Sequence, residues 1–209
     1  MPEKMLMPAS RIVSMSSSPA PTLPNPKPSV RLPRDGAGGS ISVPTMDDIL
    51  AASRAQNLDL SLDRLGPFFR ITARSSVTGR ELGRFEGLVR VWSRGKILHL
   101  DSIRLKKETL GMEKSIFGIG VFIGAVAIRH GYDCGCRIAE LLAINDSDLY
   151  HSKLVRFYTR IGFKAVHEVT GSTMGDLAHM LVWGGVGTRM DADIDELMVK
   201  WCSRFKPRK

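Results

Sequence analysis

The segment SIFGIGVFIGAVAIRHG, residues 115–131, carries the residue spacing in this chain that most directly suggests chemistry. Three glycines, Gly118, Gly120 and Gly124, interrupt a run of branched and aromatic residues. Glycines at the start of a helix allow a phosphate to approach the unpaired backbone N–H groups of the first turn. The segment therefore fits three structures: a membrane-spanning helix, a dinucleotide-binding loop, or a core helix whose first turn holds a phosphate-bearing group.

Length and context decide between these three structures. Ile116 to Ile128 contains 13 uncharged residues, about 20 Å of helix, whereas a bilayer core is about 30 Å thick. The glycine spacing is close to a dinucleotide fingerprint, and Glu140 follows Gly120 by twenty residues. However, a polar loop separates the glycines from the preceding strand, and Glu140 falls inside a strand rather than at its end. We therefore predict a core helix, with Gly118 and Gly120 near a phosphate and Gly124 used for packing.

Two carboxylates lie on predicted strands, where a base for proton transfer would be held in place. Asp101 belongs to ILHLDSIRL and Glu140 to the apolar run CRIAELLAI. A carboxylate in such a run is costly to bury unless it is paired, so each residue is a candidate base or an ion-pair partner. His99 is two residues from Asp101, which predicts the same strand face and possible assistance. The histidines and cysteines show no zinc-ligand spacing, so no metal site is predicted.

Charge and composition restrict the class of protein. The chain has 209 residues, a net charge of +9, 43% hydrophobic residues and 24% charged residues, which are globular values. The positive charge indicates a solvated surface or an encounter with an anionic ligand, and no stacking-aromatic signature of nucleic-acid binding accompanies it. Residues 1–45 are rich in Ser and Pro, basic and poor in acids. This composition predicts a disordered transit peptide for the chloroplast stroma, with a mitochondrial or cytoplasmic protein as the alternative.

The elements that must position these residues follow residue 45 and form one folded domain, residues 46–209. A helix capped by Thr45 is expected first, and three antiparallel strands follow it, separated by glycine-containing turns. The expected order is helix 46–58, strands 68–76, 82–92 and 97–105, the glycine-rich helix, strand 136–144, helix 147–162, strands 163–171 and 179–186, and helix 191–205. This order predicts an α/β protein with a mixed sheet, in which the central strand–helix–strand unit is a right-handed parallel crossover.

Three motifs in this order resemble the GNAT superfamily of acyl-CoA-dependent N-acyltransferases. They are the loop SIFGIG at 115–120, the strand GCRIAELLAIN beginning at Gly135, and YTRIGF at 158–163. The resemblance covers roughly residues 68–185. It implies a GNAT-like fold, with an antiparallel meander, a strand–helix–strand–helix unit, and a C-terminal hairpin and helix. It also implies an N-acetyltransferase that moves an acetyl group from its co-substrate acetyl-CoA to an amine by direct attack.

The same resemblance assigns roles to residues of this chain. Tyr158 would protonate the leaving thiolate, and Asp101 or Glu140 would accept the proton of the amine. Acetyl-CoA would contact Leu105, Ser115, Ile116, Phe117, Gly118, Ile119, Gly120 and Asn145. Ser115 stands where the family has Arg or Gln, and the polar loop before it is several residues longer than usual. The alternative is therefore a catalytically inactive GNAT-like module that senses acyl-CoA or binds a protein partner.

Overall fold

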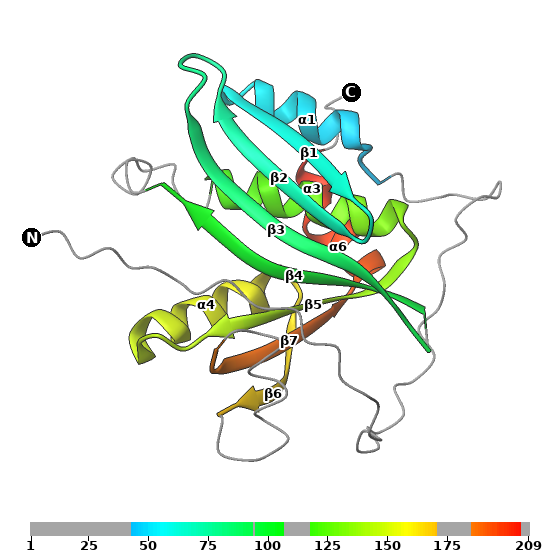
Figure 1. Cartoon of the computed structure of the whole chain (residues 1–209), viewed down its shortest axis with the longest axis vertical. Coiled ribbons are helices and arrows are strands. Elements are labelled where there is room, and N and C mark those ends of the chain that lie inside the picture. The colour runs from blue at the N-terminus through cyan, green and yellow to red at the C-terminus, as the bar shows by residue number, and fades with distance from the viewer. Residues whose placement is uncertain (1–42, 94, 107–117, 171–184, 206–209) are drawn as a thin grey trace, which may run out of the picture.

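A seven-stranded mixed sheet forms the centre of the computed structural model, which describes residues 43–93, 95–106, 118–170 and 185–205 (Figure 1). The strand order is β1-β2-β3-β4-β5-β7-β6, with an antiparallel pairing everywhere except between β4 and β5, which are parallel. The elements are α1 (Met46–Arg54), β1 (Leu58–Leu65), β2 (Phe68–Ser75), β3 (Glu81–Trp92), β4 (Gly95–Leu105), α3 (Gly120–Asp133), β5 (Cys136–Ile144), α4 (Asp148–Ile161), β6 (Lys164–Val169), β7 (Gly187–Asp193), α6 (Ile194–Lys200) and η2, a 3₁₀ turn (Cys202–Phe205). The predicted α/β class and mixed sheet are confirmed.

The amino-terminal part of the fold differs from the prediction by one strand. Thr45 caps α1 as expected, in a reciprocal pair of hydrogen bonds with Asp48. The helix ends at Arg54, however, and Leu58 to Leu65 form β1, so the meander has four strands rather than three. Leucine and polar residues alternate with a period of two from Leu58 to Asp63, which suits a sheet with one buried face. Because leucine has a weaker strand preference than β-branched residues, this alternation was not identified as a strand from the sequence.

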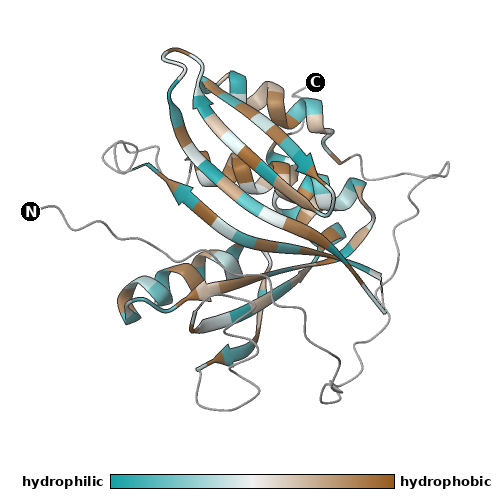
Figure 2. Ribbon diagram, in the orientation of Figure 1, coloured by the Kyte–Doolittle hydropathy of each residue, from teal (hydrophilic) through white to brown (hydrophobic). Residues whose placement is uncertain are grey.

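Helix α3 packs on one face of the sheet and forms much of the core. Its residues Ile123, Val126 and Ile128 are buried, which explains why the glycine-rich run is so apolar. Helices α1 and α6 contact α3, and in Figure 1 both α3 and α6 lie behind the sheet. Figure 2 shows hydrophobic and hydrophilic bands alternating along the strands, as expected when one face of a sheet is covered and the other is not.

The carboxyl-terminal part corrects a helix boundary. The last helix begins at Ile194 rather than at Asp191, because residues 191–193 belong to β7. The Asp193 side chain accepts hydrogen bonds from the backbone N–H groups of Asp195 and Glu196, which starts the helix there. β7 pairs with β6 as a hairpin and also with β5. The strand predicted at 179–186 lies almost wholly outside the described residues.

Other expectations also fall outside the described residues. The predicted transit peptide is described only from residue 43, and the polar loop at 106–115 only at residue 106. Within the described ranges, no helix is both long and apolar enough to cross a bilayer.

Candidate active site at the split between β4 and β5

The strands β4 and β5 are paired over half of their length and then separate. Parallel pairing joins Lys96–Leu100 to Cys136–Leu141. Beyond these residues β4 continues to Leu105 and β5 to Ile144 without pairing to each other. Figure 1 shows the two strands side by side at one end and diverging toward their carboxyl ends. The separation leaves, in the described sheet, two facing edges whose backbone groups have no ladder partner.

A β-bulge marks the point where the separation begins. Gly87 of β3 lies opposite Leu100, and Glu86 lies opposite Ser102, so Asp101 is an extra residue with no partner on β3. Such a bulge bends its strand and takes backbone groups out of the ladder. Here the bend directs the rest of β4 away from β5.

The amino end of α3 lies over the separated half of β4. Among the described residues, a Cβ atom at Gly120 would meet only Ile103 of β4, at an ordinary contact distance of 3.7 Å. No side chain described in the structure caps this helix, and its backbone is already helical at Gly118 and Ile119, which form a π turn before α3. Gly124 differs, because a Cβ there would overlap the Trp201 ring. The prediction that Gly124 serves packing is confirmed.

Neighbouring residues of β4 point to opposite faces of the sheet. Leu98 lies under α3, within 2.7 Å of where a Cβ of Gly131 would be. His99 therefore points to the face opposite α3. Its side chain is 4% exposed and lies 3.0 Å, Nδ1 to Oε1, from Glu140 on β5, whose side chain is fully buried. His99 and Glu140 are opposite each other in the last part of the ladder before the strands separate.

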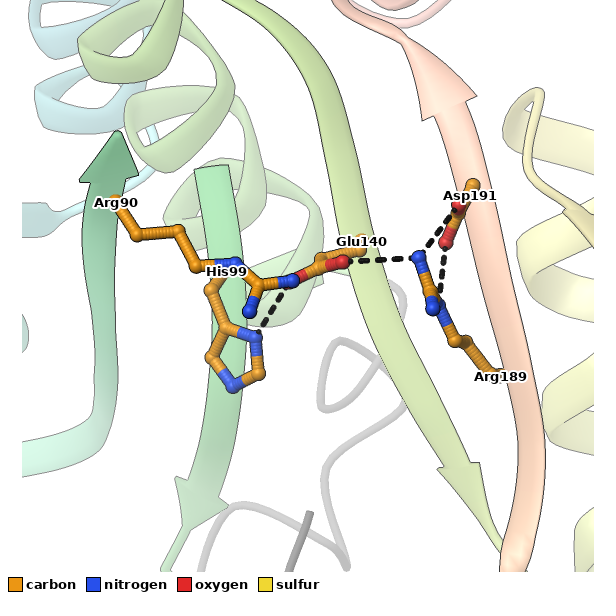
Figure 3. Close-up of polar contacts among 5 residues, drawn as sticks. All are labelled: Arg90, His99, Glu140, Arg189 and Asp191. Atoms are coloured by element: carbon orange, nitrogen blue, oxygen red, sulfur yellow. Dashed lines mark hydrogen bonds and ion pairs between the residues drawn. The ribbon is translucent and has the colours of Figure 1, made fainter. Parts of the chain in front are cut away.

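Glu140 is the centre of a charged network drawn from four strands (Figure 3). Arg90 reaches across β4 from β3 and places a guanidinium nitrogen 2.5 Å from Oε1. Arg189 of β7 lies 3.1 Å from Oε2 and also pairs with Asp191 at 3.0 Å. Two carboxylates and two guanidinium groups therefore balance one another around a buried histidine.

The network sets the protonation of its acids. Burial alone would raise the pKa of Glu140, but the hydrogen bond from His99 and the charges of Arg90 and Arg189 together lower that pKa below its ordinary value. Glu140 is therefore an anion at neutral pH. Burial raises the pKa of Asp191, although Arg189 partly opposes this. A buried carboxylate anion paired with a histidine is the arrangement that orients an imidazole for proton transfer.

Tyr158 lies on the last turns of α4, which packs on β5, β6 and β7. Its ring makes edge contacts with Phe157 and Phe163, at centroid distances of 5.3 and 5.8 Å. Burial, with a smaller contribution from Tyr150, raises the pKa of Tyr158 to about 12. Its phenol therefore keeps its proton at neutral pH. Among the described residues, no hydrogen bond joins Tyr158 to Glu140 or Asp101.

The remaining predicted site residues are distributed along the split. Leu105 ends β4 and packs beside Gly83 of β3. Asn145 follows β5 and lines a separate open cleft of about 400 Å³ together with His151 and Thr188, whose side chains are hydrogen-bonded to each other. Gly118 and Ile119 directly precede α3. Ser115, Ile116 and Phe117 lie outside the described residues, so their predicted contacts remain predictions.

The structure also adds residues that sequence reasoning missed. Arg90, Arg189 and Asp191 were not singled out, and His99 was expected to assist Asp101, whereas the structure pairs it with Glu140. The assignment of 191–205 to a helix had removed Asp191 from the sheet. A signal was available for Arg90, since LVRVW places one cation among four apolar residues of a predicted strand.

No protein-family model matches the chain, and no curated protein matches it in sequence. Solved structures with a similar fold include nourseothricin acetyltransferase, 15% identical over 66% of this chain and 85% of its own, with a TM-score of 0.42. They also include AtaTR bound with AcCoA, 11% identical over 70% of this chain and 74% of its own, with a TM-score of 0.42. A GNAT-family acetyltransferase from Streptococcus pneumoniae is 14% identical over 73% of this chain and 96% of its own, with a TM-score of 0.41. At these identities and scores the similarities assign no function, so a proposed function has to rest on the geometry of this chain.

Proposed function

We propose that the protein is an acyl-CoA-dependent N-acetyltransferase. The observation that carries the proposal is the separation of β4 from β5 directly beside the uncapped amino end of α3. Facing strand edges with unpaired backbone groups suit an extended ligand that contains amide groups, as the pantetheine arm does. The positive end of a helix, with glycine at its first position, suits the pyrophosphate at the other end of that arm.

The residues at the split support each part of an acyl transfer. The His99–Glu140 pair takes the proton that the attacking amine loses, with Glu140 holding the imidazole in place. Backbone N–H groups released by the bulge at Asp101 suit the developing oxyanion. As the new C–N bond forms and the C–S bond breaks, Tyr158 gives its proton to the leaving sulfur and regains one from solvent.

A thermal-shift titration with acetyl-CoA tests the proposal. A ligand that binds the native state stabilises it by about 2.7 kcal/mol at a concentration one hundred times its Kd. We expect Gly120→Ala to weaken acetyl-CoA binding about tenfold, because the added methyl group occupies the approach to the backbone. Gly185→Ala is the control, since a Cβ there meets no atom of the described residues within 4 Å. Absence of any shift at millimolar acetyl-CoA would contradict the proposal.

Measuring kcat distinguishes an active acetyltransferase from a catalytically inactive module that only binds acetyl-CoA. Tyr158→Phe removes the proton donor and keeps the ring contacts, so kcat is expected to fall while acetyl-CoA affinity is retained. An unchanged kcat would exclude Tyr158 as the acid. Acetyl-CoA binding without acetylation of any amine in a broad panel would favour the sensing or protein-interaction module instead.

A further inference from the structure

We infer that the acceptor is a primary ammonium compound with an apolar group, and that it binds in an open cleft over β1–β4. The inference rests on the proposed acyl transfer, because it names the class of amine that would receive the acetyl group. The cleft has a volume of about 390 Å³, and Asp101 and Leu88 are among its lining residues. Asp101 is the bulge residue, so the cleft ends at the point where β4 leaves β5.

Strand register arranges the cleft as two adjacent rows of side chains. One row is apolar and crosses the sheet through Leu65, Phe68 and Leu88 to His99. The other row is polar and contains Asp63, Arg70, Glu86 and Ser102. Both rows lie on the face opposite α3, because Phe69, between Phe68 and Arg70, packs against His130 of α3. The apolar row therefore runs to Leu88, whose register partner on β4 is the buried His99 of the His99–Glu140 pair.

The charged residues that line the cleft on this face are net negative, which favours a cation. Arg70 is held by Glu86, with guanidinium and carboxylate atoms 2.8 Å apart. Arg64 also borders the cleft, but its position in β1 places its side chain on the α3 face. The pKa of His130, on α3, is lowered first by burial and then by the charge of Arg64. Asp63 and Asp101 have no ion pair within the described part of the chain. A chain of net charge +9 thus keeps two free carboxylates in the cleft that reaches the split.

The apolar row indicates what the ammonium group is attached to. Leu65 is 81% exposed and Phe68 is 53% exposed. Successive strands lie about 4.8 Å apart, so the three apolar residues form a strip of about 10 Å. A flat hydrocarbon or aromatic group on this strip would remove apolar surface from water. With its ammonium group at Asp101, such a compound would hold its nitrogen two residues along β4 from His99. A polyamine would leave the strip unused, and an acidic acceptor would be repelled.

Calorimetric binding of 2-phenylethylamine without acetyl-CoA tests the cleft directly. Three probes each lack one feature: 2-phenylethanol has no charge, ethylamine has no ring, and 3-phenylpropanoate has the opposite charge. We expect 2-phenylethylamine to bind about tenfold more tightly than each of them. Asp101→Asn should weaken the amine about tenfold, whereas Asp59→Asn, on the same face of β1 and opposite Arg74, should not. Equal binding of amine, alcohol and acid would overturn the inference.

Steady-state kinetics keep this inference distinct from the proposed function. We expect Asp101→Asn to raise KM for the amine with kcat retained, and Phe68→Ala to raise KM for 2-phenylethylamine but not for ethylamine. A loss of kcat in Asp101→Asn would make Asp101 the base and overturn its role as the ammonium site. If acetyl-CoA binds and the amine ranking fails, the inference is wrong and the transferase remains. If acetyl-CoA does not bind, the transferase is wrong, and the calorimetric ranking still tests the cleft.

Discussion

The two halves of β4 have opposite environments although they are continuous in sequence. The first half, up to Leu100, is paired on both sides, and Leu98 and His99 are buried. The second half begins at the unpaired Asp101, and from Ser102 it is paired only with β3 within the described sheet; Ile103 is 42% exposed. The first half holds a fixed charged network, while the second leaves room for a ligand. Stability and the proposed access for a substrate thus involve adjacent parts of one strand.

The largest expected contrast between the halves is in stability. Glu140→Gln leaves Arg90 and Arg189 facing a neutral, buried amide, which we expect to cost about 3 kcal/mol of unfolding free energy. Asp101→Asn, in the open half, should cost less than about 0.5 kcal/mol. Urea denaturation at pH 7 measures both values. Equal losses in the two variants would remove the distinction between the halves.

Helix α3 spans both halves, so two alanine substitutions can compare them. Gly131→Ala places a methyl group against the buried side chains of Leu98 and Ile194, at 2.7 and 2.9 Å, whereas Gly120→Ala makes only an ordinary contact. Both changes gain helix propensity, and only the first is overpacked. We expect Gly131→Ala to be about 2 kcal/mol less stable than Gly120→Ala by thermal or urea unfolding. Equal stability would mean that the core over the paired half adjusts freely.

Acid titration of stability should also separate the halves. The pKa of Glu140 is lowered from 4.5 in the folded protein, so its contribution is present above pH 4.5 and is lost as the pH falls through the folded value. Asp191, whose pKa is raised by burial, acts in the opposite sense. The stability difference between wild type and Glu140→Gln should therefore narrow below pH 4.5, as followed by urea unfolding at several pH values. A difference that does not change with pH would contradict the network.

The smallest expected effect concerns the exposed ion pair on the open face. The Arg70 and Glu86 side chains are 51% and 33% exposed, and exposed pairs contribute little because water and salt screen them. Arg70→Met should change the unfolding free energy by less than about 0.5 kcal/mol, with the difference decreasing further in 0.5 M salt. A loss comparable to that of Glu140→Gln would show that the open face also stabilises the fold.

Local patterns were sufficient for most of the elements. The apolar run CRIAELLAI forms β5 with the predicted bounds, and the Thr45 cap starts α1 where expected. Gly162 ends α4 with a φ of 124°, a conformation that suits glycine. The main errors were β1, which was not predicted, and β7, of which no residue was predicted as strand because the final helix was placed from Asp191. In both segments, short polar residues within a strand gave a weak local signal, and sheet pairing determined the outcome.

By itself, the sequence determined the α/β class, the core helix after Gly118 and the presence of a carboxylate within β5. These features depend on periodicity and caps, which act over a few residues. The tertiary structure decided which groups meet at Glu140, since His99 and Arg189 are 41 and 49 residues away from it. It also decided that Asp101 leaves the ladder. Strand register controls both outcomes, and a shift of one residue would turn His99 to the opposite face of the sheet.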